Sequence, residues 1–107
     1  MTPMHGYIYR LLPPRSTFSD DMTPEEADMM GDHVAYWSEL AAAGRVLAFG
    51  PVADPEEPYG FAVILAPSRA AVELMRDRDP AILSSRGFNA EIATIRHLIT
   101  PTGAFPG

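Results

Sequence analysis

The segment from Tyr59 to Ala66, YGFAVILA, most constrains what this chain can fold into. Its centre, FAVIL, is apolar at every position, whereas a strand with one face in water alternates apolar and polar residues. Both faces of this strand therefore have to be covered. Two other extended segments also have apolar residues on both faces. In one, Tyr7 and Tyr9 lie on the face opposite Ile8 and Leu12, and in the other, Leu47 and Phe49 lie on the face opposite Val46 and Ala48.

A long helix has clear start and stop signals. In the stretch TPEE, Thr23 is the N-cap, Pro24 takes the first helical position, and Glu26 completes a capping box. Gly44 can adopt the left-handed conformation that ends the helix. The apolar stripe of this helix has His33 in its middle and consists of Met29, Met30, Tyr36, Trp37 and Leu40.

A second helix begins at the N-cap Ser68 and runs to about Arg78, and we expect Ala71, Leu74 and Met75 to point inward. The residue before a proline disfavours helix, so Asp79-Pro80 should break it. Asp79 can itself cap a short turn from Pro80 to Ser85, which Gly87 closes. Because asparagine also caps well, the cap alone predicts that Asp79→Asn changes folding little.

The extended segments are Tyr7–Leu12, Val46–Val52, Tyr59–Ala66 and Phe88–Thr100, the last with a bulge or bend near Thr94. With the helices they give the order βαββαβ, which is the ferredoxin-like α+β fold, with two helices on one face of a four-stranded antiparallel sheet. The sequence predicts one domain over residues 1–107, in which about 101–107 form a loosely held tail. A second copy is the simplest cover for the other face, so we expect a homodimer with the sheets face to face.

The composition excludes several classes of partner. Fourteen acidic residues against eight basic ones give a net charge of −6, which repels nucleic acid and anionic lipid surfaces. The chain has no cysteine, which is compatible with a reducing compartment. No stretch has the length and apolar character of a membrane span or a signal sequence. We therefore expect a cytoplasmic protein with no nucleic-acid or membrane partner.

The stretch HVAYWSELAAAGRVLAFGPV, followed after the third strand by RDRDP, resembles the YciI-like (YCII-related) family. The shared pattern is a histidine in the first helix, a helix-ending glycine, a strand leading to Gly-Pro, and Asp-Pro after the second helix. This resemblance implies a dimeric α+β barrel with a site centred on His33 and Asp79, and acid–base or lyase-like chemistry. The chain departs from the pattern in its approach TPEEADMMGD to His33 and in its long connection from Pro13 to Met22.

For His33 and Asp79 a structural and a functional interpretation both remain open. His33 could be a satisfied core histidine, and Asp79 a helix cap. Alternatively, the Asp79 carboxylate accepts a hydrogen bond from one ring nitrogen of His33, fixes its tautomer and leaves the other nitrogen as a base.

The surroundings of His33 have two interpretations as well. Gly50-Pro51 could simply end a strand, or Gly50 could open space beside the imidazole, in which case we expect Gly50 and Pro51 to bind ligand. The aromatic residues are candidates for the core, for the dimer interface or for the lining of a ligand pocket, and those proposed to bind ligand are Tyr9, Trp37 and Phe49. Arg78 either lies on a solvated helix end or holds an anionic substrate.

We expect neither a metal nor another cofactor. His5, His33 and His97 lack a ligand spacing, and no phosphate-binding loop or dinucleotide motif occurs. Two hypotheses of function result. The first is a small-molecule enzyme of isomerase or lyase type that uses His33 and Asp79, and the second is a non-catalytic binding or accessory protein with the same dimer pocket.

Overall fold

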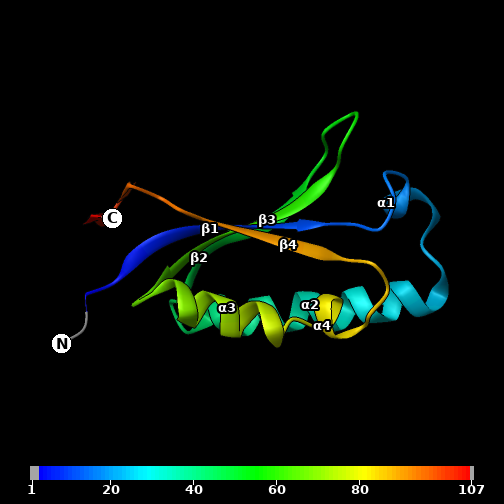
Figure 1. The fold of residues 1–107 in the computed structure, drawn as a ribbon, viewed down its shortest axis with the longest axis horizontal. Coiled ribbons are helices and arrows are strands. Elements are labelled where there is room, and N and C mark those ends of the chain that lie inside the picture. The colour runs from blue at the N-terminus through cyan, green and yellow to red at the C-terminus, as the bar shows by residue number, and fades with distance from the viewer. Residues whose placement is uncertain (1–2, 107) are drawn as a thin grey trace.

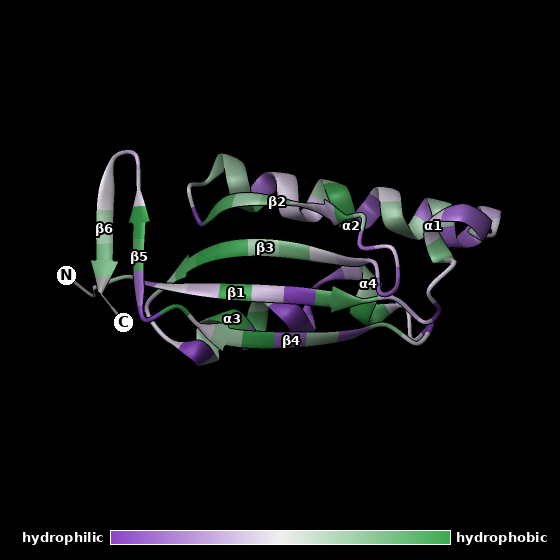
Figure 2. Cartoon of the chain, turned by 90° about the horizontal axis from the view of Figure 1, so that it is seen from above, coloured by the Kyte–Doolittle hydropathy of each residue, from purple (hydrophilic) through white to green (hydrophobic). Residues whose placement is uncertain are grey.

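The computed structural model describes residues 3–106. Its elements are β1 (His5–Leu12), α1 (Phe18–Asp21), α2 (Pro24–Ala42), β2 (Val46–Val52), β3 (Tyr59–Ala66), α3 (Arg69–Asp77), α4 (Pro80–Leu83), β4 (Asn89–Thr94), β5 (His97–Thr100) and β6 (Gly103–Pro106). Strands β2, β3, β1 and β4 lie side by side in this order in one antiparallel sheet (Figure 2). This confirms the expected ferredoxin-like α+β fold, to which the short helices and the β5–β6 hairpin are added.

Helices α2, α3 and α4 lie together under one face of the sheet, and the other face carries no helical layer (Figure 1). The core fills the space between the sheet and the helices. Its buried members are Tyr7, Tyr9, Leu11, Trp37, Val46, Ala62, Ile64, Ala66, Val72, Met75 and Ala81. Every second residue of β1 and β3 contributes to it, as a strand with one core-facing side requires.

The helix boundaries agree with the local signals. The side chain of Thr23 accepts a hydrogen bond from the Glu26 N–H, and the Glu26 side chain accepts one from the Thr23 N–H, which is the expected capping box. Gly44 ends the α2 region with a φ of +78°. In α3, however, Val72 is fully buried and Leu74 is 57% exposed, so the expectation that Leu74 points inward is wrong.

A bulge in β2 changes which residues face the core. The pairing with β3 shifts between Val46 and Ala48, and Phe49 then pairs with Ala62. Val46 and Phe49 both pack toward the helices, while Leu47 is 43% exposed. The expectation that Phe49 lies on the face opposite Val46 is wrong, because the extra residue breaks the alternation.

The C-terminal segment bends where the sequence predicts it, since β4 ends at Thr94 and β5 begins at His97. The tail from 101 was expected to be loosely held, whereas Gly103–Pro106 forms β6 and pairs with β5. Leu98 packs so closely over Gly6 that a Cβ there would lie 2.8 Å from Leu98 Cδ2. The hairpin is thus seated against β1, and Gly107 lies outside the described residues.

The sheet face away from the helices has a mixed character. Ile8, Phe61 and Val63 are half-buried there, and Arg10 pairs with Glu91 across the strands at 3.1 Å. Among residues 3–106, none of the helices has the length and apolar character needed to cross a lipid bilayer.

Candidate functional site

A pocket of about 490 Å³ opens between α1, α2 and the β2–β3 hairpin. Its walls are mostly apolar and come from five parts of the chain. They consist of Tyr9, Leu11 and Pro13; Phe18, Ser19 and Met22; Met30, His33, Val34 and Trp37; Phe49–Ala53 and Pro58–Ala62; and Phe88. A volume of this size suits a compact organic molecule.

His33 and Asp79 are in direct contact. The Nδ1 atom of His33, in the middle of α2, lies 2.7 Å from Oδ1 of Asp79, the N-cap of α4. The His33 side chain is 12% exposed and lines the pocket, whereas the Asp79 side chain is fully buried behind it. The arrangement presents the imidazole to the pocket and keeps the carboxylate away from it.

Asp79 accepts four hydrogen bonds. Its Oδ1 accepts from His33 and from the Ala81 N–H at 2.9 Å. Its Oδ2 accepts from the Tyr9 hydroxyl at 2.9 Å and from the Trp37 indole N–H at 3.0 Å. The cap and the contact with His33 therefore coexist on one carboxylate, and every polar position of this buried group is satisfied.

The electrostatic environment keeps Asp79 ionised. Burial raises the pKa of its carboxyl, but the hydrogen bond and charge of His33 and the N–H groups of Ala81 and Trp37 outweigh that effect, so the pKa is lowered. Burial, together with the charge of Asp79, raises the pKa of the Tyr9 phenol, which remains a donor.

An ionised carboxylate can only accept hydrogen bonds, so the proton between the two residues belongs to His33 Nδ1. In the neutral imidazole the other nitrogen, Nε2, then carries a free lone pair. No group of residues 3–106 forms a hydrogen bond with Nε2. The pair can therefore supply one general base at the wall of the pocket.

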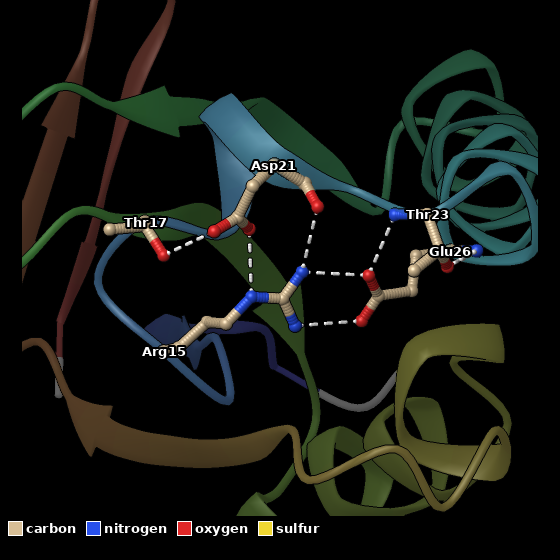
Figure 3. Close-up of polar contacts among 5 residues, drawn as sticks. All are labelled: Arg15, Thr17, Asp21, Thr23 and Glu26. Atoms are coloured by element: carbon tan, nitrogen blue, oxygen red, sulfur yellow. Dashed lines mark hydrogen bonds and ion pairs between the residues drawn. The ribbon is translucent and has the colours of Figure 1, made fainter.

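The connection between β1 and α2 carries one wall of the pocket and is fixed by Arg15 (Figure 3). The Arg15 guanidinium donates to both oxygens of Glu26, at 2.8 and 2.9 Å, and to the Asp21 carboxylate at 2.8 Å. Thr17 donates to the same Asp21 side chain at 2.7 Å. This bidentate anchor holds α1 against the start of α2.

The residues expected around His33 meet in one place. Tyr9, Trp37, Phe49, Gly50 and Pro51 all line the pocket with it. A Cβ added to Gly50 would have no neighbour within 4 Å, so the space beside this glycine is open. Phe49 reaches the pocket because of the bulge in β2.

Sequence reasoning missed several other wall residues. Phe18 and Phe88 form an edge-to-face pair with ring centroids 5.0 Å apart, and both line the pocket. Phe18 stands alone in a polar stretch, so no periodic pattern marks it, and Phe88 was predicted only as the first residue of the last extended segment. The aromatic identity of Phe18 in an otherwise polar connection was the one available signal.

Arg78 lies elsewhere. It borders a second groove, of about 440 Å³, between α2 and α3, together with Tyr36, Leu40, Arg45 and Leu74. Within residues 3–106, no three side chains of histidine, cysteine, aspartate or glutamate gather as a metal site would require.

The model of the YCII-related domain family matches residues 14–96, which is more than half of the chain. The match contains α2, with His33, and the turn that begins at Asp79. The comparison with curated proteins gives no match.

Proposed function

The chain belongs to the YCII-related domain family, and from this premise we propose that it is a small-molecule enzyme in which His33, oriented by Asp79, transfers protons. One observation carries the proposal. His33 lines an apolar pocket, and its Nδ1 is paired with a buried carboxylate, so Nε2 is the ring nitrogen that remains to accept a proton.

The pocket favours a mechanism with one base. Among the described lining residues, His33 is the only imidazole. The remaining side-chain polar groups are the indole N–H of Trp37, which is a donor only, and the hydroxyls of Tyr9, Ser19 and Tyr59, which are weaker bases. The Tyr9 hydroxyl is already engaged with Asp79. The nitrogen that removes a proton from the substrate is then also the group that returns it.

This single base limits the reaction class. Nε2 takes a proton from a carbon of the substrate, and the resulting imidazolium is balanced by the Asp79 carboxylate. The same N–H then delivers the proton to another atom of the substrate, which gives an isomerisation, or to a departing group on the same side, which gives an elimination. Atoms and charge balance in both cases without a co-reactant.

The test uses 5-nitrobenzisoxazole, an uncharged compound that opens when a base removes its ring C–H proton. The N–O bond breaks, the electron pair stays on oxygen, and the product is a coloured nitrophenolate. We expect wild type to accelerate this opening over buffer and His33→Ala to lose at least about tenfold of the rate. His97→Ala, on the exposed β5 strand, is the matched control and should keep the wild-type rate.

The alternative is a non-catalytic binding or accessory protein that uses the same pocket. It predicts equal rates for wild type and His33→Ala, because binding needs the shape of the pocket and not a base. Equal rates would overturn the proposed enzyme and favour this alternative.

We also propose that the chain is a homodimer through the sheet face away from the helices. Support comes from the apolar side chains on that face, among them Ile8, Phe61 and Val63. Arg10 adds to it, because its Nε is buried and has no hydrogen-bond partner among residues 3–106. A second copy would supply apolar contacts and an acceptor in one step.

A further inference from the structure

The lining of the His33 pocket carries no charged partner for an anion. Among the described residues that form it there is no lysine, arginine, aspartate or glutamate. Recognition of a carboxylate or a phosphate in a protein pocket normally uses an arginine, a lysine or a cluster of backbone N–H groups.

Arg10 and Arg15, which lie beside wall residues in the chain, are engaged with other groups, and Arg78 lies away from this pocket. Arg10 pairs with Glu91 and stacks over the Tyr59 ring, with its guanidinium carbon 4.3 Å from the ring centroid. Arg15 is neutralised by Glu26 and Asp21. Arg78 borders the other groove. None of these three cations is available to a ligand that lies against His33.

The charge directly behind His33 is negative. The Asp79 carboxylate lies directly behind His33, 2.7 Å from its Nδ1, and its side chain is fully buried. Burial reduces solvent screening, so this charge opposes a second anion at Nε2 more strongly than a surface carboxylate would. The net charge of −6 acts in the same direction at longer range.

The shape of the walls favours a flat ring. Tyr9 and Trp37 are packed with centroids 4.8 Å apart on one side, and the Phe18–Phe88 pair stands at another wall. Phe49 adds further aromatic surface. Aromatic walls bind planar apolar molecules through stacked and edge-to-face contacts.

Resting on the function proposed above, we infer that the substrate is an uncharged, planar aromatic molecule that places a weakly acidic C–H at Nε2 of His33, and that the pocket rejects anions. The Asp79 carboxylate also repels a product that becomes anionic. Its charge thus selects against anionic ligands before the reaction and favours release of an anionic product after it.

The test compares two probes of nearly equal shape, 4-nitrobenzamide, which is uncharged, and 4-nitrobenzoate, which is an anion at pH 7. Trp37 is the only tryptophan of the chain and lines the pocket, so quenching of its fluorescence reports binding. We expect the amide to bind at least about tenfold more tightly than the benzoate, which corresponds to about 1.4 kcal/mol.

A designed cation should reverse this selection. Ser19 is exposed on α1 and lines the pocket, so Ser19→Lys places an ammonium group at its rim. We expect benzoate to bind at least about fivefold more tightly to Ser19→Lys than to wild type, with the amide little changed. Ser38→Lys makes the same change of charge on an exposed position of α2 outside the lining and should leave both affinities as in wild type.

The outcomes separate this inference from the proposed function. Equal or tighter binding of benzoate to wild type overturns the inference, as does an amide that does not quench Trp37 at millimolar concentration. Preference for the amide together with a ring-opening rate that does not depend on His33 supports the selection against anions, but overturns the proposed enzyme and with it the placement of a C–H at Nε2.

Discussion

The Nδ1 atom of His33 and the Oδ1 atom of Asp79 are 2.7 Å apart, although 46 residues separate them in the chain. The histidine lies on helix α2, and the aspartate is the residue directly before α4. Because Tyr9 and Trp37 donate to the second carboxylate oxygen, the aspartate is held from both sides and its orientation toward the imidazole is fixed. Its role as a cap and its role beside the histidine depend on the same buried charge.

The first prediction concerns Asp79→Asn. An amide has one acceptor oxygen, so donors on one side of residue 79 would face an NH₂ group and lose their acceptor. We expect the free energy of unfolding to fall by about 2–3 kcal/mol in urea denaturation at pH 7. The cap alone predicts little change, because asparagine also caps a helix well. The other donors to Asp79 reverse that expectation.

Asp77→Asn is the matched control for that substitution. Asp77 is exposed and, among residues 3–106, pairs only with its neighbour Arg76 at 3.0 Å. Loss of such a surface pair should change stability by less than about 0.5 kcal/mol. Equal stability of Asp79→Asn and wild type would mean that the four donors do not converge on residue 79 in solution.

The second prediction is a loss of stability in acid through Glu26. The Arg15 hydrogen bond, followed by the Thr23 N–H, lowers the pKa of the Glu26 carboxyl from 4.5 to about 2. The folded state therefore binds this proton more weakly than the unfolded state does. Its contribution to stability is complete above pH 4.5 and is lost as the pH falls toward 2.

We therefore expect Glu26→Gln to be less stable than wild type at pH 7, and the difference to shrink steadily from pH 4.5 to pH 2. Urea denaturation at a series of pH values measures both curves. Curves that stay parallel over this interval would show that Glu26 does not pair with Arg15 in the folded protein.

The third prediction concerns the wall formed by α1. Arg15→Gln removes the bidentate contact with Glu26 and the contact with Asp21, so residues 16–22 should open more often. Hydrogen–deuterium exchange of this segment should become faster, while exchange in β3 stays as in wild type. Arg15→Lys keeps the charge but not the planar guanidinium group, so its exchange rate in this segment should lie between those of wild type and Arg15→Gln. No change in Arg15→Gln would mean that Phe18, and not Arg15, holds the segment.

The fourth prediction tests the proposed dimer. Light scattering at micromolar concentration should give twice the mass of one chain for wild type. Val63→Glu places a charge on the sheet face away from the helices and should yield monomer, because burial of an unpaired charge costs several kcal/mol. Leu74→Glu, at a 57% exposed position on α3, should remain dimeric. Dissociation of Leu74→Glu alone would put the interface on the helical layer.

The sequence by itself determined what depends on neighbours along the chain. The capping box of Thr23 and Glu26, the helix end at Gly44 and the turn at Asp79-Pro80 all form as predicted. Each of them is decided by hydrogen bonds or dihedral preferences within a few residues. The order of strands and helices followed from these local signals, and with it the ferredoxin-like plan. The pairing of His33 with Asp79 came from the family resemblance, since a spacing of 46 residues does not indicate contact.

Tertiary structure alone decided what depends on distant partners. The alternation of side chains along a strand does not show from the sequence where a bulge will interrupt it. Only pairing with β3 therefore placed Phe49 on the core side. The sequence left Tyr9 and Trp37 as candidates for the core, the dimer interface or a ligand pocket, and only packing brought both donors to Asp79. Phe18 and Phe88 joined one wall because Arg15 anchors the connection that carries Phe18. The site is made of contacts between elements, and the energy of such contacts depends on a geometry that no single segment contains.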